Sequence, residues 1–150
     1  MAMFRLALFL LMPGVVQADA TSLETYLSAK PLRMEVRYCE CTVISPDGRS
    51  PDPLPGFMDQ ADALSVAVEA QDKGFISTEV LFLGYALQPE AGAPEAFRFQ
   101  YVGDFTTPRG HNSARGAVIL EKNQWVSLWG SQGGDGITGV AVRLTDTTGP

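Results

Sequence analysis

The chain has 150 residues, of which 45% are hydrophobic and 19% are charged, and its formal net charge is −6 at pH 7. That is enough chain for one domain with a hydrophobic core that needs no metal and no dense disulfide network. An acidic domain is repelled by phosphate backbones and by anionic membrane surfaces, so the charge argues against nucleic acid as a partner.

Residues 1–20 have the pattern of a secretory signal peptide. Arg5 precedes the apolar run Leu6–Met12, and Ala18-Asp19-Ala20 has the small-x-small form that signal peptidase cuts. A membrane anchor is the less favoured alternative, because the apolar run is about half of the roughly 20 residues that a spanning helix needs. The pattern predicts a periplasmic or secreted protein with no stable transmembrane segment after cleavage.

Residues 21–31 allow either a short helix or a tail. Thr21 and Glu24 have capping-box spacing, and Leu23 and Leu27 form a small apolar face before Pro31. A frayed N-terminus is the equally weighted alternative.

Residues 32–146 are expected to form a single β-domain, followed by a polar tail at 147–150. Apolar residues alternate with charged ones at its start, at Leu32, Met34, Val36 and Tyr38. The apolar phase then moves to Cys39 and Cys41, which predicts a bulge or a crossing between sheets. Residues 45–63 contain four prolines and are expected to be a loop.

Further strands are expected at residues 64–70 and 75–87, separated by a turn at 72–74. The part Val80–Leu87 is apolar on both faces, so it is either a central strand covered on both sides or a surface that meets another chain. Phe97–Tyr101 alternates strictly, and a loop is expected at 105–113.

The stretch Arg115–Gly130 predicts a β-hairpin, because two apolar runs flank the polar residues 121–124. Trp125 and Trp129 are four residues apart, so in a strand both would face the same side. That side is the core by default, or an aromatic patch for a partner. After a glycine-rich tip, residues 140–144 form the last strand. The whole pattern predicts an all-β fold of about seven strands, as an antiparallel β-sandwich or an open sheet.

The Cys39-Glu40-Cys41 pair is the main chemical candidate. In a strand such residues share a face with Cα atoms about 6–7 Å apart, at the upper limit for a disulfide, and an easily reduced bond would suit a redox-active pair. Two buried thiols, or a structural bridge that a bulge allows, are the alternatives. His111 has no nucleophile motif around it, so no catalytic residue, metal or cofactor is expected.

Three stretches resemble the core β-domain of bacterial secretins, the outer-membrane pores of type II and III secretion and of type IV pili. Pro31–Cys41 is similar to the strand that opens that domain, Leu64–Val68 with Gly74–Val80 to its paired strands, and Ser113–Gly130 to its late hairpin. The proline-rich 45–63 segment is too short to supply the pore-lining hairpins. The resemblance therefore implies an accessory component of a secretion or pilus system that lacks the pore.

A second likeness, on Cys39 and Cys41 alone, is to the small periplasmic curli-system protein with a Cys-x-Cys on an immunoglobulin-like sandwich. The favoured interpretation is a non-enzymatic exported domain that binds another envelope protein. The surface would be a strand edge or the residues Phe82, Tyr85, Trp125 and Trp129. The alternatives are a thiol-disulfide or curli-type chaperone protein that uses the cysteine pair, and a small-ligand binder with a cavity between its sheets.

Overall fold

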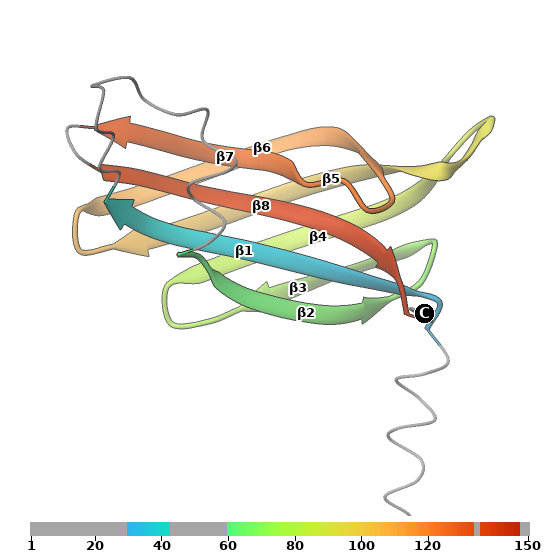
Figure 1. Ribbon diagram of the computed structural model, residues 1–150, viewed down its shortest axis with the longest axis horizontal. Helices are drawn as coiled ribbons and strands as arrows, with labels where there is room; N and C mark the ends of the chain where they lie inside the picture. Colours follow the sequence, from blue (N-terminus) through green and yellow to red (C-terminus); the bar gives the residue numbers. More distant parts are fainter. Residues whose placement is uncertain (1–29, 43–59, 134–135, 148–150) are drawn as a thin grey trace, which may run out of the picture.

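The computed structural model describes residues 30–42, 60–133 and 136–147. Within these ranges eight strands and no helix are present, and the strands form two antiparallel four-stranded sheets (Figure 1). The predicted all-β antiparallel sandwich is confirmed, with eight strands in place of about seven. The leader, residues 21–29 and most of the proline-rich segment lie outside the described residues.

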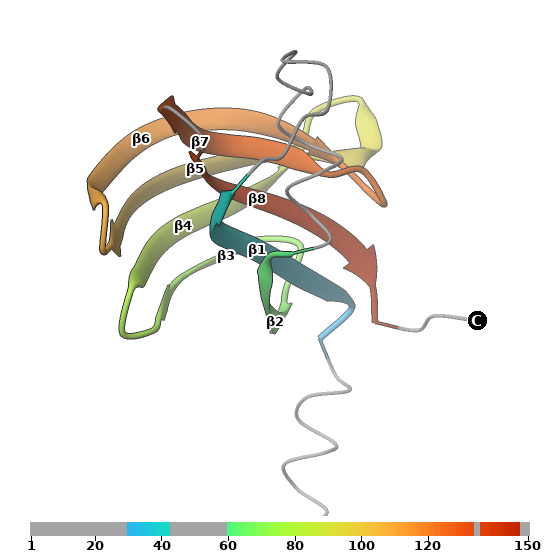
Figure 2. The same ribbon diagram turned by 60° about the vertical axis from the view of Figure 1, so that its left-hand side comes forward.

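Each sheet consists of four strands, and the two sheets face each other (Figure 2). Sheet A has the order β2-β1-β8-β7 and contains β1 (Leu32–Thr42), β2 (Asp62–Val68), β7 (Val126–Gly133) and β8 (Gly136–Asp146). Sheet B has the order β3-β4-β5-β6 and contains β3 (Asp72–Ser77), β4 (Leu81–Glu90), β5 (Ala93–Thr107) and β6 (Gly110–Glu121). Apart from the first and last strands, which pair with each other, every hydrogen-bonded pair is consecutive in the chain. The topology is thus an up-and-down meander divided between two sheets.

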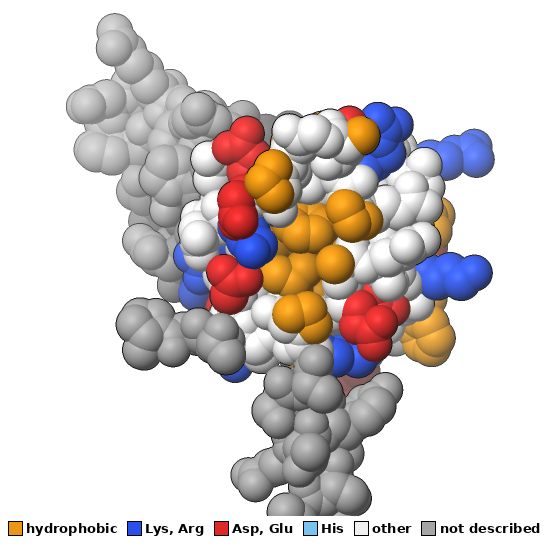
Figure 3. Space-filling model, turned by 90° about the vertical axis from the view of Figure 1, so that its right-hand side faces the viewer, with side chains coloured by type: hydrophobic (Ala, Val, Ile, Leu, Met, Phe, Trp, Pro, Cys, Tyr) orange, Lys and Arg blue, Asp and Glu red, His pale blue; other side chains and the backbone are white. Residues whose placement is uncertain are grey.

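Ion pairs join strands at the end of the sandwich where β1 begins and β8 ends. Lys122 Nζ lies 2.9 Å from Asp146 Oδ1 and 3.1 Å from Glu95 Oε2, and Lys30 Nζ lies 3.5 Å from Asp72 Oδ2. Figure 3 views this end, where apolar side chains are seen between acidic and basic ones. None of the described residues belongs to a helix of the length and apolar character that crossing a bilayer requires.

The strand β1 does not contain the predicted bulge. It pairs with β8 along its whole length without a break in register. Tyr38 faces the other sheet, whereas Cys39 and Cys41 lie on the outer face of sheet A. Glu40 takes the inner position between them, where its Oε1 lies 3.4 Å from Arg109 Nε. The prediction was wrong because the apolar cysteines belong to the outer face, so the side-chain phase never changes.

The single strand expected at 75–87 is two strands in the structure, β3 and β4, and this accounts for eight strands in place of about seven. Thr78 closes the turn between them, because its N–H donates to the Leu81 carbonyl (2.8 Å) and its hydroxyl accepts from the Leu81 N–H (3.0 Å). The preceding turn lies at residues 69–71, before the predicted position, and the Asp72 carboxylate accepts the Glu69 N–H across it (3.2 Å). In both turns a short polar side chain forms hydrogen bonds with the local backbone. These bonds end the strand, although the apolar residues on either side would favour a continuous one.

The predicted hairpin at 115–130 is instead a crossover between the sheets. The strand β6 pairs with β5, and β7 pairs with β8. At the corner Asn123 has φ +66°, and its N–H donates to the Leu144 carbonyl of sheet A (2.7 Å). The Lys122 N–H donates to the Glu95 carbonyl of sheet B (3.1 Å). The polar residues 121–124 therefore form backbone hydrogen bonds with both sheets, and the chain passes from sheet B to sheet A at this corner.

The expected loop at 105–113 is largely a hairpin. The strand β5 continues to Thr107 and β6 begins at Gly110, which leaves only residues 108–109 between them. Gly110 has φ +154°, a conformation that favours glycine. His111 therefore lies in β6, where it is exposed, and not in a loop.

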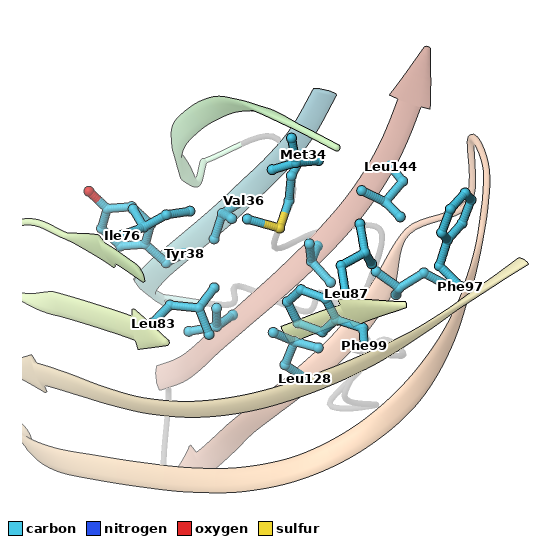
Figure 4. Packing of buried hydrophobic residues seen from close by; sticks show 14 of the residues in the cluster. Met34, Val36, Tyr38, Ile76, Leu83, Leu87, Phe97, Phe99, Leu128 and Leu144 are labelled. Carbon is cyan, nitrogen blue, oxygen red and sulfur yellow. The ribbon is translucent and has the colours of Figure 1, made fainter. Parts of the chain in front are cut away.

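The hydrophobic core fills the space between the sheets (Figure 4). Met34 and Val36 of β1 face Leu83 and Leu87 of β4, and all four are essentially inaccessible to solvent. Phe99 lies among them, with its ring stacked against two tyrosines on the same face of sheet B. Each such side chain contributes about 1.5–3 kcal/mol when it is fully buried, so these layers are the main source of stability.

Those two tyrosines extend to the two margins of sheet B. Tyr85 lies over Gly74 of β3, and Tyr101 lies over Gly116 of β6, where an added Cβ would be 2.9 Å from the tyrosine hydroxyl. The Tyr101 hydroxyl reaches past β6 and donates to the Leu128 carbonyl of β7 (2.6 Å), which ties the two sheets together. Among the described residues the Tyr85 hydroxyl makes no such bond, and burial, followed by the charge of Asp72, raises its pKa.

Candidate partner-binding surface

Three of the large apolar side chains that are exposed on the outer face of sheet B lie close together on the neighbouring strands β3, β4 and β5. Phe75 of β3 is 71% exposed, Val102 of β5 is 51% exposed and Phe82 of β4 is 39% exposed. Phe75 and Val102 are the two register partners of Gly84, and the Phe82 ring stacks on the Phe75 ring with centroids 6.1 Å apart. We call Phe75, Phe82, Gly84 and Val102 the apolar patch. Contiguous exposed apolar groups of this kind mark binding surfaces.

The alternation of β4 explains why part of this patch is on the surface. Leu81, Leu83, Tyr85 and Leu87 face the core, so Phe82, Gly84 and Ala86 face outward. Within the described residues only one face of the Val80–Leu87 segment is covered, and Phe82 projects from the other. Among the described residues the segment is thus not covered on both faces, and the other alternative, a surface that meets another chain, stays a prediction.

Gly84 has no side chain, and this allows the apolar side chains around it to lie close together. A Cβ at this position would lie 3.2 Å from Val102 Cγ1 and 3.7 Å from Phe82 Cε1. The side chains from three strands therefore meet above the glycine backbone. Since Gly84 offers no side chain opposite Phe75, the Phe75 ring has a neighbour on one side only.

Two cations border the patch without an ion pair among the described residues: Lys73, two residues before Phe75, and Arg115, the register partner of Val102. The other charged groups of this face are engaged. Arg98 lies 3.4 Å from Glu90, Asp104 lies 3.4 Å from His111, and the Glu121 carboxylate accepts from the Gln124 amide (2.8 Å). A predominantly acidic protein thus presents an apolar area between two free positive charges.

The four aromatic candidates named from the sequence lie in three different places. Phe82 is in the apolar patch, whereas Tyr85 and Trp129 pack against the core between the sheets. The strand β7 has a register shift between Ser127 and Trp129, so that Leu128 and Trp129 both face inward. Trp125 lies before the strand and packs on the outer face of sheet A. The expectation that the two tryptophans share a side is therefore wrong, because a bulge separates them.

Trp125 is enclosed by charged side chains of its own sheet. The Arg143 guanidinium lies 4.7 Å from the ring centroid and that of Arg37 lies 5.6 Å away. The Glu35 carboxylate accepts from Arg143 Nε (3.0 Å) and fixes that guanidinium in place. Cation–π contacts of this kind stabilise a half-buried indole. Sequence reasoning missed the cluster, because its members are far apart in the chain.

Cys39 and Cys41 form a disulfide with their Cα atoms 5.5 Å apart. They are 6% and 5% exposed, and they pack against Ala141, Ala61 and Trp125. Exchange begins with attack of a thiolate on a sulfur atom, so a pair that is covered in this way reacts slowly unless the cover moves. The alternative of two buried thiols is therefore wrong, whereas a structural bridge and a redox-active pair would both contain this bond.

A polar hollow of about 340 Å³ lies at the end of the sandwich opposite to that in Figure 3, lined by Thr107, Arg109, Gly110, His111, Asn112, Ser131, Gly136 and Thr138. His111 Nδ1 lies 3.0 Å from Thr106 Oγ1, whereas the Ser131 hydroxyl bonds to Thr138. Thr106 and His111 thus form a hydroxyl–imidazole contact here, with Asp104 Oδ1 3.4 Å from His111 Nε2, and the side chains of Thr106 and His111 are exposed to solvent. The described residues contain no group of three histidine, cysteine or carboxylate side chains that could hold a metal ion.

Comparison of the chain with family models, with curated proteins and with solved structures found no match.

Proposed function

We propose that this chain is a non-enzymatic, exported β-domain that binds another envelope protein through the apolar patch. The observation that carries the proposal is the stacking of two phenylalanines on an otherwise regular sheet face that no described residue covers. Leaving such side chains in water is unfavourable for an isolated domain, and a partner that covers them recovers the free energy of apolar burial.

The cellular setting in the proposal comes from the sequence. The leader pattern of residues 1–20 supports export to the periplasm or beyond. The resemblance to the secretin core β-domain supports a role as an accessory component of a secretion or pilus system.

A capture experiment tests the proposal. The chain, tagged at its C-terminus and expressed with its leader, is recovered from envelope extract, and bound proteins are identified by mass spectrometry. We expect Phe75→Ser/Phe82→Ser to reduce capture of the partner by at least about tenfold, as loss of aromatic anchors does at other interfaces.

The matched control is Ile119→Ser. Ile119 is 46% exposed on the same face, but it lies on β6, four residues beyond Arg115 and outside the patch. This variant should capture the partner as the wild type does. Equal capture by the double variant, or no envelope protein captured by the wild type, would contradict the proposal.

The rival proposal is a thiol-disulfide or curli-type chaperone protein. It is favoured by the bond between Cys39 and Cys41 and opposed by their burial. In that case Cys41→Ser should accumulate a mixed disulfide with a partner, visible as a reducible band after electrophoresis. If the remaining thiol resists alkylation in the folded protein and reacts only after unfolding, the redox role is ruled out.

A further inference from the structure

We propose that the partner binds as an extended segment added to the free edge of β3, with an apolar side chain opposite Phe75 and a carboxylate two residues away, opposite Lys73. This inference rests on the proposed function and names the kind of segment that the surface would recognise. It is supported by three observations on the described residues: an open strand edge, an apolar side chain on that edge, and a free cation beside it.

The first observation is the difference between the two margins of sheet B. At the β6 margin, the Tyr101 hydroxyl and the backbone bonds of residues 122–123 link sheet B to sheet A. At the other margin, β3 pairs only with β4, and β2, the preceding strand, pairs only with β1. One side of β3 therefore presents backbone groups with no strand partner in the described chain. Such an edge accepts a further strand through main-chain hydrogen bonds.

The second observation is the position of Phe75 on that edge. Its neighbour in β4 is Gly84, so its ring contacts Phe82 diagonally and has nothing directly opposite. A strand added on the free side would place a side chain opposite Phe75 with Cβ atoms about 4.5–5.5 Å apart. An apolar side chain there would cover the most exposed large hydrophobic residue of the patch.

The third observation is the charge beside Phe75. Lys73 lies on the same face of β3, and no described carboxylate pairs with it. The nearest in sequence, Asp72, is already occupied by Lys30 Nζ (3.5 Å) and by the backbone N–H of Glu69 (3.2 Å). Alternate residues of a strand share a face, so a carboxylate two positions from the apolar residue would meet Lys73. The recognised segment is thus extended and carries a carboxylate two residues from the apolar side chain, after it in the sequence if the segment pairs antiparallel to β3 and before it if the segment pairs parallel.

Arg115 distinguishes a segment that pairs with the edge of β3 from a partner that lies flat on the outer face of sheet B. It borders the same patch, but it lies on β6, three strands from the free edge. A segment added to β3 would not reach Arg115. A partner lying flat across the patch would approach both cations.

The test uses the protein purified from the cell envelope, ¹⁵N-labelled, and the synthetic peptide acetyl-Thr-Glu-Val-Phe-Val-Glu-Thr-amide as the probe, which places a glutamate opposite Lys73 in either strand direction. Titration followed by NMR should shift the amide signals of β3 most. Lys73→Glu should raise the Kd about tenfold, whereas Arg115→Glu should change it less than about twofold. A peptide with lysine in place of both glutamates should bind more weakly. A peptide N-methylated on the valines and the phenylalanine should not bind, because the added strand needs its N–H groups.

Three results would overturn the inference. The first is shifts centred on β4 and β5 together with sensitivity to Arg115→Glu, which would mean docking on the face. The second is concentration-dependent dimerisation in sedimentation that Phe75→Ser removes, which would mean that a second copy occupies the edge. The third is the absence of peptide binding while envelope capture still depends on Phe75 and Phe82. In that case the proposed function stands and the edge mode fails.

Discussion

On the outer face of sheet A the largest side chain, Trp125, contacts two guanidinium groups, whereas on the outer face of sheet B the largest side chains, Phe75 and Phe82, face solvent. Both faces come from strands with the same alternation of inward and outward residues. On sheet A the Trp125 ring is contacted by two arginines and packs against the disulfide of the same sheet. Sheet B stacks two aromatic rings and leaves two cations free. The difference indicates that the outer face of sheet A contributes to the stability of the fold, whereas that of sheet B leaves apolar side chains in water, where we propose that the partner binds. Each of the following variants tests part of this contrast.

Trp125→Ala should have the largest effect on stability. It removes the indole that packs on Ala141 and the cysteines and that both arginines contact, so the free energy of unfolding should fall by about 2–3 kcal/mol. Urea denaturation followed by circular dichroism measures this change. A loss comparable to that of an exposed residue would mean that the cluster on sheet A contributes little.

Cys39→Ala/Cys41→Ala should have the next largest effect. The disulfide closes a loop with only one residue between the cysteines, so the constraint that it places on the unfolded chain is small. We expect a loss of about 1–2 kcal/mol in the same denaturation experiment. Binding to the partner should not change, because the pair lies on the opposite sheet from the patch. Loss of binding with an intact fold would favour the rival role of the cysteines.

Lys122→Met tests the corner where the two sheets meet. The hydrogen bonds that Lys122 donates to Asp146, and then to Glu95, raise its pKa above the ordinary value of 10.5. A raised lysine pKa stabilises the fold fully below the unfolded-state value and loses that contribution as the pH rises through the folded-state value. The free energy of unfolding of the wild type should exceed that of the variant by about 0.5–1 kcal/mol at pH 7. The difference should shrink above pH 10.5, which thermal unfolding across the pH range can follow.

Phe75→Ser should have the smallest effect on stability, below about 0.5 kcal/mol, because the ring is mostly in water. Partner capture by the same protein should nevertheless fall. A large loss of stability would mean that the patch belongs to the core and would remove the contrast between the two faces.

The alternation of apolar residues was sufficient to predict most strands, because side-chain direction in a strand depends only on local sequence. Phe97–Tyr101 and residues 140–144 both lie in strands as expected. Strand partners were harder to predict. The corner at Asn123 depends on a bond to Leu144, twenty-one residues later, and no local pattern distinguishes that corner from a hairpin turn.

The candidate surface could be predicted only in part. Phe82 was identified because it lies in a run that is apolar on both faces. Phe75 and Lys73 were missed, because a turn was expected at 72–74 and these residues were not placed on an edge strand. The available signal was that Lys73 and Phe75 are two residues apart and would share one face of a strand. Asp72-Lys73-Gly74 was instead interpreted as a turn, so the strand was expected to begin only at Phe75.

The position of β8 has a consequence for how the molecule forms. This strand lies between β1 and β7 and is hydrogen-bonded to both, so sheet A has no centre until Gly136–Asp146 is free to pair. Pairing β1 with β8 joins residues more than a hundred positions apart, and such distant contacts slow folding. A ribosome or translocation channel that releases the polypeptide from its N-terminus would therefore free β1 long before the strand with which it pairs, whereas the consecutive strands of sheet B can pair as they emerge.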